Sequence, residues 1–237
     1  LRCFTAIDLP AMNNSTPRKL LLALAIAFCE QVLAQSYPSK PVRLVVPFPA
    51  GGATDILART ISQRASDKLG QQIVIDNRPG AGGTIGSDQV AKAPPDGYTL
   101  LIATGSTHSI GPITNAKIPY NVERDFAPVV YVARTSSVLV VPHHLPVKTL
   151  AEFIALLKAN PGKYNYGSSG NGTNSHLSGE LFKAQANVFM THIPYRGGPL
   201  GMADVIAGQV DVMFIAVTPA LPHVRDGRLV ALASGGA

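Results

Sequence analysis

Short apolar runs alternate with segments of helical periodicity along most of this chain of 237 residues. Runs rich in Val, Ile and Leu favour buried strands, whereas apolar residues that recur every three or four positions favour amphipathic helices. The predicted strands are Val42–Val46, Gln72–Asp76, Thr99–Ala103, Pro128–Val132, Val138–Val141, Lys163–Tyr166, Val210–Ala216 and Leu229–Ala233. The predicted helices are Thr54–Leu69, Thr84–Ala91, Thr149–Asn160, Asn174–Ala186 and Pro199–Ala207. This alternation predicts an α/β architecture with largely parallel sheets.

Polar, glycine-rich loops follow three of the predicted strands, at Phe48–Thr54, Thr104–His108 and Gly167–Thr173. In parallel α/β sheets, ligands bind beyond the carboxyl ends of the strands. These loops offer hydroxyl and backbone N–H donors with little formal charge, a donor set that suits a carboxylate or a similar oxyanion. One such loop alone is usually a solvated connection, but its recurrence after three strands favours a binding pocket.

The first of these loops connects a predicted strand to a predicted helix. Gly51 and Gly52 would let a ligand approach the unpaired N–H groups and the partial positive charge at the helix start. The alternative is that the glycines only form a tight turn and that Thr54 or Asp55 caps the helix. Asp55 has two possible roles beside an anion. It caps the backbone, which predicts a simple mono- or dicarboxylate ligand, or it receives the ammonium group of an amino acid ligand.

The amino-terminal residues predict export from the cytoplasm. Arg18 and Lys19 precede the apolar run Leu20–Cys29, and small residues follow up to Ala34. This order is typical of a secretory signal peptide, and we expect cleavage after Ala34. The apolar run is shorter than the roughly 20 residues that a membrane-spanning helix needs.

Composition and charge limit the ligands and partners that are expected. Both cysteines, Cys3 and Cys29, fall in the predicted leader, so the mature chain is expected to lack disulfides and Cys-bound metals. The formal net charge of +6 favours anionic ligands in general. Lys and Arg are scattered without a basic run, so no nucleic acid partner is expected.

This sequence matches the known enzyme motifs poorly. Gly167–Gly170 lacks the spacing of a Gly-x-Ser-x-Gly nucleophile elbow, and Gly80–Gly86 has one residue too many for a dinucleotide fingerprint. The six histidines show no metal-binding spacing. We therefore predict no catalytic residue, no cofactor and no metal. A periplasmic α/β enzyme acting on a small acidic substrate and a ligand sensor for a signalling protein stay open as alternatives.

A series of ordered motifs resembles a known family. The motifs are Pro47–Asp55, Asn77–Gly83, Pro95–Leu100, Tyr166–Gly170, Ile193–Gly198 and Gly208–Val212. Together they resemble the Bug-type substrate-binding receptors of tripartite tricarboxylate transporters, over a stretch from about Tyr37 to the last residue. The resemblance implies a periplasmic binding protein type II-like clamshell of two α/β domains with a ligand cleft between them.

The resemblance also implies roles for particular residues. The loops Ala50–Asp55 and Thr104–His108 would grip one carboxylate, partly through bound waters, while Ser168–Thr173 and the segment around Tyr195 would close from the other domain. The loaded receptor would act as a monomer and deliver its organic acid to the membrane subunits of the transporter. The predicted ligand-binding residues are Phe48, Ala50, Gly51, Gly52, Thr54, Asp55, Thr104, Gly105, Ser106, Ser168, Ser169, Gly170, Thr173, His176 and Tyr195.

Three parts of the chain are expected. Residues 1–34 hold the upstream residues and the signal peptide, residues 35–136 form a first α/β domain, and residues 137–237 form a second domain and the start of a return crossover. Family members continue past the segment that matches Leu229–Ser234 and return to the first domain to complete its sheet. The resemblance therefore implies a chain that is incomplete at its carboxyl end.

Overall fold

The computed structural model describes residues 37–235, and the chain from Lys40 onward forms one compact unit. The signal peptide predicted for residues 1–34, with both cysteines, lies outside the described residues. Among the helices within residues 37–235, none combines the length and the apolar character that a membrane span requires.

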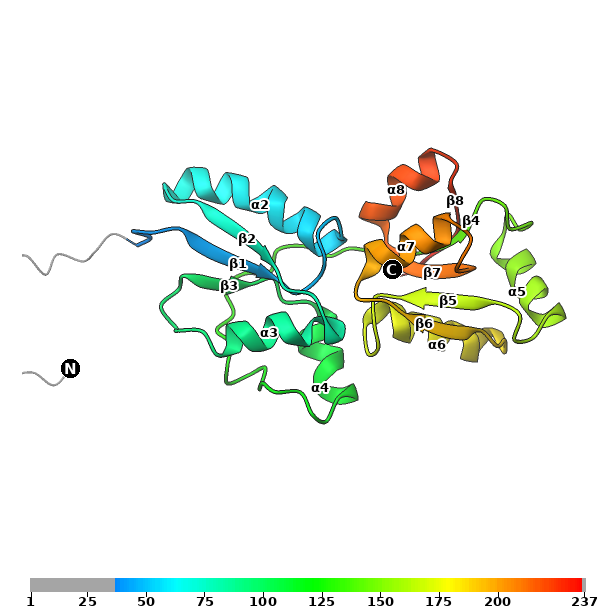
Figure 1. The fold of residues 1–237 in the computed structure, drawn as a ribbon, viewed down its shortest axis with the longest axis horizontal. Helices are drawn as coiled ribbons and strands as arrows, with labels where there is room; N and C mark the ends of the chain where they lie inside the picture. Colours follow the sequence, from blue (N-terminus) through cyan, green and yellow to red (C-terminus); the bar gives the residue numbers. More distant parts are fainter. Residues whose placement is uncertain (1–36, 236–237) are drawn as a thin grey trace, which may run out of the picture. The chain divides into compact units, whose positions relative to one another are not determined.

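The first sheet has three parallel strands. β1 (Val42–Val46) lies in the centre, between β2 (Ile73–Asn77) and β3 (Thr99–Leu101) (Figure 1). Parallel neighbours need crossover connections, which are supplied by α2 (Ala53–Leu69) and, after the short η1 (Ala81–Gly83), by α3 (Thr84–Ala91). A π-helical turn, η2 (Ser106–Ile110), and α4 (Gly111–Thr114) follow β3. This order brings the loops after β1 and β3 to the same edge of the sheet.

The second sheet has five strands in the order β6-β5-β7-β4-β8. β5 pairs in parallel with β6 and β7, whereas β4 pairs antiparallel with β7 and β8. The prediction of parallel sheets is therefore right for the first sheet and only partly right for the second. The strands are β4 (Ser137–Pro142), β5 (Asn165–Ser168), β6 (Thr191–Pro194), β7 (Val212–Ala216) and β8 (Leu229–Gly235). The helices are α5 (Leu150–Ala159), α6 (Asn174–Ala186), α7 (Gly198–Ile206) and α8 (Val217–Arg225).

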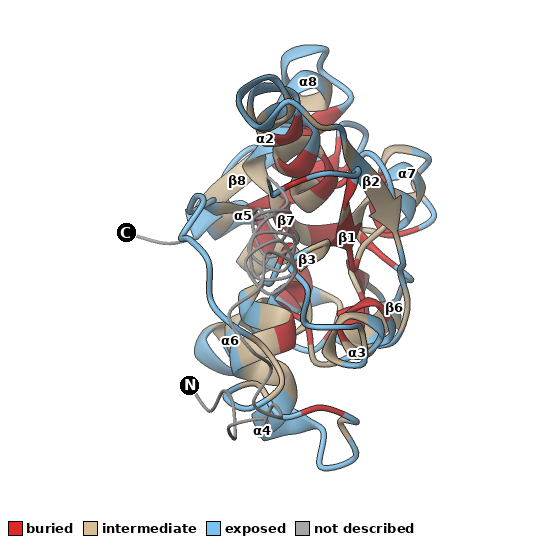
Figure 2. Cartoon of the chain, turned by 90° about the vertical axis from the view of Figure 1, so that its left-hand side faces the viewer, coloured by how far each residue is buried: buried red, intermediate tan, exposed pale blue. Residues whose placement is uncertain are grey.

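β4 is buried on both faces and supplies two apolar cores. Val138 and Val140 point to one core, which also holds residues of α7 and α8, and Leu139 and Val141 point to the other, which holds residues of α5. Successive side chains of a strand point to opposite faces, so one strand can serve both cores. Figure 2 shows buried positions concentrated in central strands such as β1 and β7.

One strand prediction is wrong. The run Pro128–Val132 has the β-branched composition of a strand, but it lies outside every strand of the described chain, and Val129 and Val130 are 78% and 74% exposed. Composition shows only that a segment would suit a sheet, because a strand also needs a hydrogen-bonded neighbour. β4 begins at Ser137, and the division of the chain into domains at residues 35–136 and 137–237 stays a prediction.

The strand β6 and the helix α8 were not predicted, and neither were the short turns η1, η2 and α4. β6 has only four residues and ends at Pro194, which gives too short a pattern for a strand to be recognised. α8 contains Pro222, a residue that normally argues against a helix interior. β6 leads directly into Tyr195, one of the predicted site residues.

Candidate functional site

The loop between β1 and α2 leaves backbone donors at a helix start. Gly51 has a positive φ of 78°, which favours glycine, and Gly52 is the N-cap of α2. Gly52 has no side chain to cap the helix, and the first N–H groups of any helix lack intrahelical acceptors. These N–H groups, with the partial positive charge of the helix end, are candidate donors to an anion.

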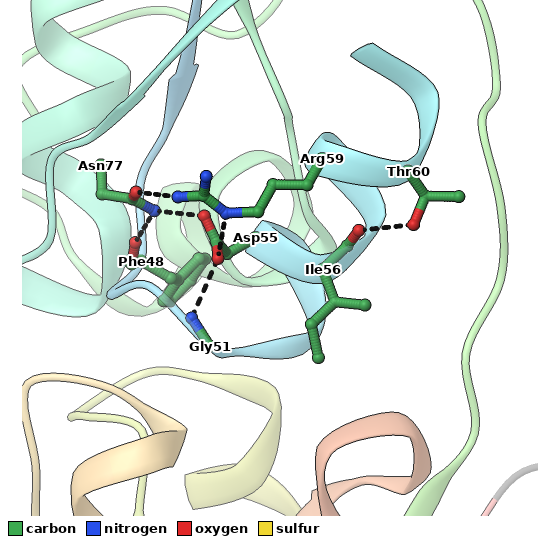
Figure 3. A network of polar contacts seen from close by, with 7 residues as sticks. All are labelled: Phe48, Gly51, Asp55, Ile56, Arg59, Thr60 and Asn77. Carbon is green, nitrogen blue, oxygen red and sulfur yellow. Dashed lines mark hydrogen bonds and ion pairs between the residues drawn. The ribbon is translucent and has the colours of Figure 1, made fainter. Parts of the chain in front are cut away.

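Asp55 lies in the first turn of α2, next to this loop, and is held by three donors (Figure 3). Its Oδ2 accepts hydrogen bonds from Gly51 N and Arg59 Nε, both at 2.9 Å, and its Oδ1 accepts one from Asn77 Nδ2 at 3.0 Å. The same Asn77 amide donates to Phe48 O at 3.0 Å. Burial alone would raise the pKa of Asp55, but the bonds from Arg59, Gly51 and Asn77 hold this pKa below its usual value. The carboxylate is thus ionised and its oxygens have partners within the protein, but its backbone donor, Gly51 N, precedes the N-cap Gly52, and no side chain caps the first N–H groups of α2.

Thr107 organises the loop after β3. Its Oγ1 accepts a hydrogen bond from Thr104 N at 3.1 Å and lies 2.9 Å from Nδ1 of His108. The hydroxyl of Tyr120 donates to Thr107 O at 2.8 Å, and Thr107 is only 1% exposed. Burial lowers the pKa of His108, so this ring adds no positive charge near neutral pH. The side chains of Thr104 and Ser106 are left partly exposed as candidate donors.

Hydroxyl groups within the loop after β5 fix its shape. Ser168 Oγ accepts a hydrogen bond from Gly170 N at 3.1 Å and lies 2.7 Å from His192 Nε2. The hydroxyl of Thr173 donates to Gly170 O at 2.7 Å. Ser168 and Thr173 are both buried, whereas Ser169 is partly exposed. Ser169 is therefore the hydroxyl of this loop best placed to meet a ligand.

Tyr195 and His176 make contacts within the protein. The hydroxyl of Tyr195 donates to Asp204 Oδ2 at 2.5 Å, and burial together with this bond raises the pKa of Tyr195 to about 12. His176 Nδ1 accepts a hydrogen bond from Gly172 N at 3.1 Å. These contacts indicate that both side chains support the loops, and direct binding of a ligand by either one stays a prediction.

Loops from the two sheets meet at the candidate site. Asn174 N, the first N–H of α6, donates to Ser106 Oγ at 3.1 Å. A Cβ atom built on Gly82 would lie 3.0 Å from Asn171 O, so these backbones approach closely. The structure thus brings the loop after β3 to the start of α6, and the segment at Gly82 to the loop after β5. The predicted site residues fall in five places. The segment from the end of β1 to the first turn of α2 holds Phe48, Ala50, Gly51, Gly52, Thr54 and Asp55. The segment after β3 holds Thr104, Gly105 and Ser106, and the end of β5 with the loop after it holds Ser168, Ser169, Gly170 and Thr173; α6 holds His176, and Tyr195 follows β6.

Asn77 and His192 belong to the site but were not predicted as site residues. Asn77 opens a motif that was used only for the family resemblance, and His192 was considered only as a metal ligand. Ser168 and His192 have the atomic contact of a nucleophile and its base. Ser168 is fully buried, however, and its oxygen already accepts from Gly170 N, so the pair presents no accessible nucleophile.

Two open hollows of about 450 and 410 Å³ lie elsewhere, along α2 and β2. Their lining includes Gln63, Ser66 and Gln72 but none of the predicted ligand-binding residues. We therefore place the candidate site at the loops.

Comparisons with known proteins identify the family. Residues 57–236 match the model of the tripartite tricarboxylate transporter family receptor. The UPF0065 protein of the tcbD-tcbE intergenic region in Pseudomonas sp. (strain P51) is 42% identical over 228 residues, which cover 94% of this chain and 67% of the relative.

Solved structures show the same fold. An R. palustris protein with adipate is 38% identical with a TM-score of 0.82, over 84% of this chain and 66% of its own. The periplasmic binding protein BugD is 34% identical with a TM-score of 0.80, over 84% and 66%. MatC from Rhodopseudomonas palustris, with bound malate, is 33% identical with a TM-score of 0.80, over 85% and 68%. The chain spans about two thirds of the length of these proteins, and the periplasmic binding protein fold predicted from the sequence is confirmed.

Proposed function

The chain belongs to the family of tripartite tricarboxylate transporter receptors, and we propose that it captures a small organic acid in the periplasm for delivery to the membrane subunits of such a transporter. Adipate and malate, which two of its structural neighbours hold, are both small dicarboxylic acids. The proposed ligand class for this chain is therefore a small mono- or dicarboxylate.

The observation that carries the proposal is the approach of the start of α6 to the hydroxyl loop after β3, where Asn174 N donates to Ser106 Oγ. α2 begins at the loop after β1, a strand that pairs with β3, and Ser169 lies in the loop that precedes α6. Arg59 of α2 is already paired with Asp55. A carboxylate would thus be held by backbone N–H groups, hydroxyls and helix dipoles, which stabilise an anion without a paired side-chain charge.

The contacts of Asp55 favour an acid without an ammonium group. Both carboxylate oxygens accept hydrogen bonds from within the protein, and Asp55 is 2% exposed. An ammonium group could reach this carboxylate only by displacing Gly51, Arg59 or Asn77. We therefore favour a simple carboxylic acid over an amino acid.

The contact between Ser106 and Asn174 gives the proposed capture a mechanism. When loops of the two sheets approach, they exclude water from the donors, and hydrogen bonds to a carboxylate become stronger as the local dielectric constant falls. Binding would then stabilise the arrangement in which the loops meet. The ligand leaves chemically unchanged.

Calorimetric titration with adipate, malate and the neutral adipic diamide tests the proposal. We expect binding of at least one of the two acids and no binding of the diamide, because the donors recognise a negative charge. Binding of the diamide with equal affinity would contradict the proposed carboxylate site. Cross-linking of the loaded protein in cells, followed by identification of the attached membrane proteins, separates delivery to a transporter from a sensory role.

A further inference from the structure

Two histidines stack against each other behind the loop that follows β5. His176 of α6 and His192 of β6 have ring centroids 4.1 Å apart and an interplanar angle of 11°. The other face of His192 stacks on Tyr166 of β5, with centroids 4.7 Å apart. The rings thus form a stack of three, and both imidazoles reach the loop from Ser168 to Thr173.

Each imidazole presents a nitrogen that is hydrogen-bonded to this loop. Gly172 N donates to His176 Nδ1 at 3.1 Å, so this nitrogen carries no proton. Ser168 Oγ accepts from Gly170 N, and its own proton has two possible acceptors, His192 Nε2 at 2.7 Å and Gly170 O at 3.3 Å. The shorter distance is the one to His192, whose Nε2 accepts this proton in one tautomer and donates to Ser168 Oγ in the other.

The groups that face the stack leave His192 neutral. Glu180 lies nearby on α6, but it accepts the hydroxyl proton of Tyr166 at 2.5 Å and pairs with Lys183 at 2.9 Å. Burial, followed by the neighbouring His176 and Lys183, lowers the pKa of His192 to about 4, although the charge of Glu180 acts to raise it. A neutral imidazole is the form that can accept the proton of Ser168.

We propose that His192 is a positioning residue of the ligand site, which together with His176 fixes the loop Ser168–Thr173 by accepting hydrogen bonds at its two ends. The inference rests on the proposed function, because the fixed loop would hold Ser169 and the start of α6 toward the bound acid. His192 itself need not touch the ligand. Its effect passes through Ser168 to Gly170, where the chain turns toward α6.

Two substitutions separate the acceptor from the ring. His192→Phe keeps a ring that can stack on Tyr166 but removes the acceptor, whereas His192→Gln removes the ring and supplies an amide oxygen that can accept. His143→Phe, at an exposed histidine of another loop, is the matched control. Amide hydrogen exchange at Gly170 and Gly172 is measured by NMR on the ligand-free protein, and affinity is measured by titration with adipate and malate.

We expect His192→Phe to speed amide exchange at Gly170 and to weaken acid binding about tenfold, as loss of one buried hydrogen bond predicts. His192→Gln should recover most of both losses, and His143→Phe should change neither. Equal losses in both His192 variants, or unchanged exchange and affinity in His192→Phe, would overturn the proposal. Hydrolysis of p-nitrophenyl acetate by the wild type that Ser168→Ala abolishes would also overturn it, because His192 would then be a base.

The two readouts distinguish this inference from the proposed function. If the wild type binds neither adipate nor malate, the proposed ligand class fails, while amide exchange at Gly170 still decides whether His192 fixes the loop. If the wild type binds an acid and His192→Phe binds it equally well, the proposed function stands and the positioning role of His192 fails.

Discussion

The side-chain oxygen of Ser106 accepts a hydrogen bond from the backbone N–H of Asn174 at 3.1 Å, across 68 positions of sequence. Asn174 is the first residue of α6, and the preceding Thr173 uses its hydroxyl to donate to Gly170 O rather than to cap the helix. A side chain from the loop after β3 therefore performs the capping that α6 lacks locally. This bond couples the two sets of loops directly.

Removal of this bond should weaken ligand capture more than folding. Ser106→Ala leaves the N–H of Asn174 without its acceptor when the loops meet, so we expect affinity for adipate or malate to fall about 2-fold to 12-fold. Calorimetric titration measures the loss, and the melting temperature should change little. Ser109→Ala, at an exposed serine of the same turn, is the control. Equal affinities of the two variants would argue against the coupling.

The partly exposed hydroxyls of Thr104 and Ser169 are expected to bind the acid directly. Loss of a hydrogen bond to a charged group costs roughly 1.5 to 3 kcal/mol, so Thr104→Val and Ser169→Ala should each weaken binding about 10-fold to 150-fold. Thermal stability should be nearly unchanged in both, and Thr60→Val, on an exposed turn of α2, should bind normally. Wild-type affinity in both variants would remove these loops from the site.

Gly82 tests whether the close approach of the loops is needed for binding. A side chain there would meet Asn171 O at 3.0 Å, and the φ of 65° is unfavourable for alanine. Gly227 has a similar φ of 71° but has open space around it. We expect Gly82→Ala and Gly227→Ala to lose similar stability, about 1 to 2 kcal/mol, and only Gly82→Ala to lose affinity. If both variants bind the acid equally well, the approach of Gly82 to Asn171 plays no part in capture.

Asp55→Asn separates the two roles of this carboxylate. The amide would offer an N–H to one of the donors Gly51, Arg59 and Asn77, so we expect a loss of about 1 to 3 kcal/mol in the free energy of unfolding, measured by urea denaturation. Asp226→Asn, in an exposed ion pair, should lose less than about 1 kcal/mol. A wild-type preference for aspartate over succinate that disappears in Asp55→Asn would overturn the capping role.

The Asp55 carboxylate also makes the free energy of unfolding depend on pH in acid. Because its pKa is lowered by folding, the stabilisation is present above the ordinary pKa of 3.8 and is lost as the pH falls through the lower folded value. The difference in unfolding free energy between wild type and Asp55→Asn should therefore shrink in strong acid. A constant difference down to pH 2 would contradict the lowered pKa.

His192 predicts a second pH dependence at milder acidity. Its pKa is 6.5 in the unfolded chain and about 4 in the folded protein, so between these values the unfolded state binds a proton that the folded state does not. The free energy of unfolding should fall as the pH is lowered from 6.5 to 4. His192→Phe should show a smaller fall over this range in parallel denaturation experiments, and an identical fall would assign the dependence to other groups.

The sequence predicted most elements because their signals are local. β1, α3 and α6 have the predicted bounds, since buried aliphatic runs and helical periodicity are properties of a single segment. Pro128–Val132 failed because strand formation depends on a neighbour, and α8 was missed because Pro222 interrupts its pattern. Such outcomes depend on tertiary contacts that a single segment does not reveal.

In the candidate site, too, some features could be predicted from local sequence and others could not. The polar loops could be predicted because each one follows a recognisable strand. Asn77 reaches Asp55 because β2 pairs with β1 and places Asn77 beside Val46, and His192 reaches Ser168 because β6 pairs with β5 and places His192 beside Tyr166. Strand order and register decide these contacts, so the contacts could not be predicted from local sequence alone.

The partners of Asp55 all lie between β1 and the end of β2, so the shape of the first loop is fixed without any help from the second sheet. The residues that anchor the carboxylate and the residues that select among different acids can therefore change independently. Replacement of residues after β5 and β6 would change the length or shape of the acid that is accepted while the anchor keeps its form. A laboratory that seeks a sensor for a new acid should randomise those segments and leave the first loop untouched.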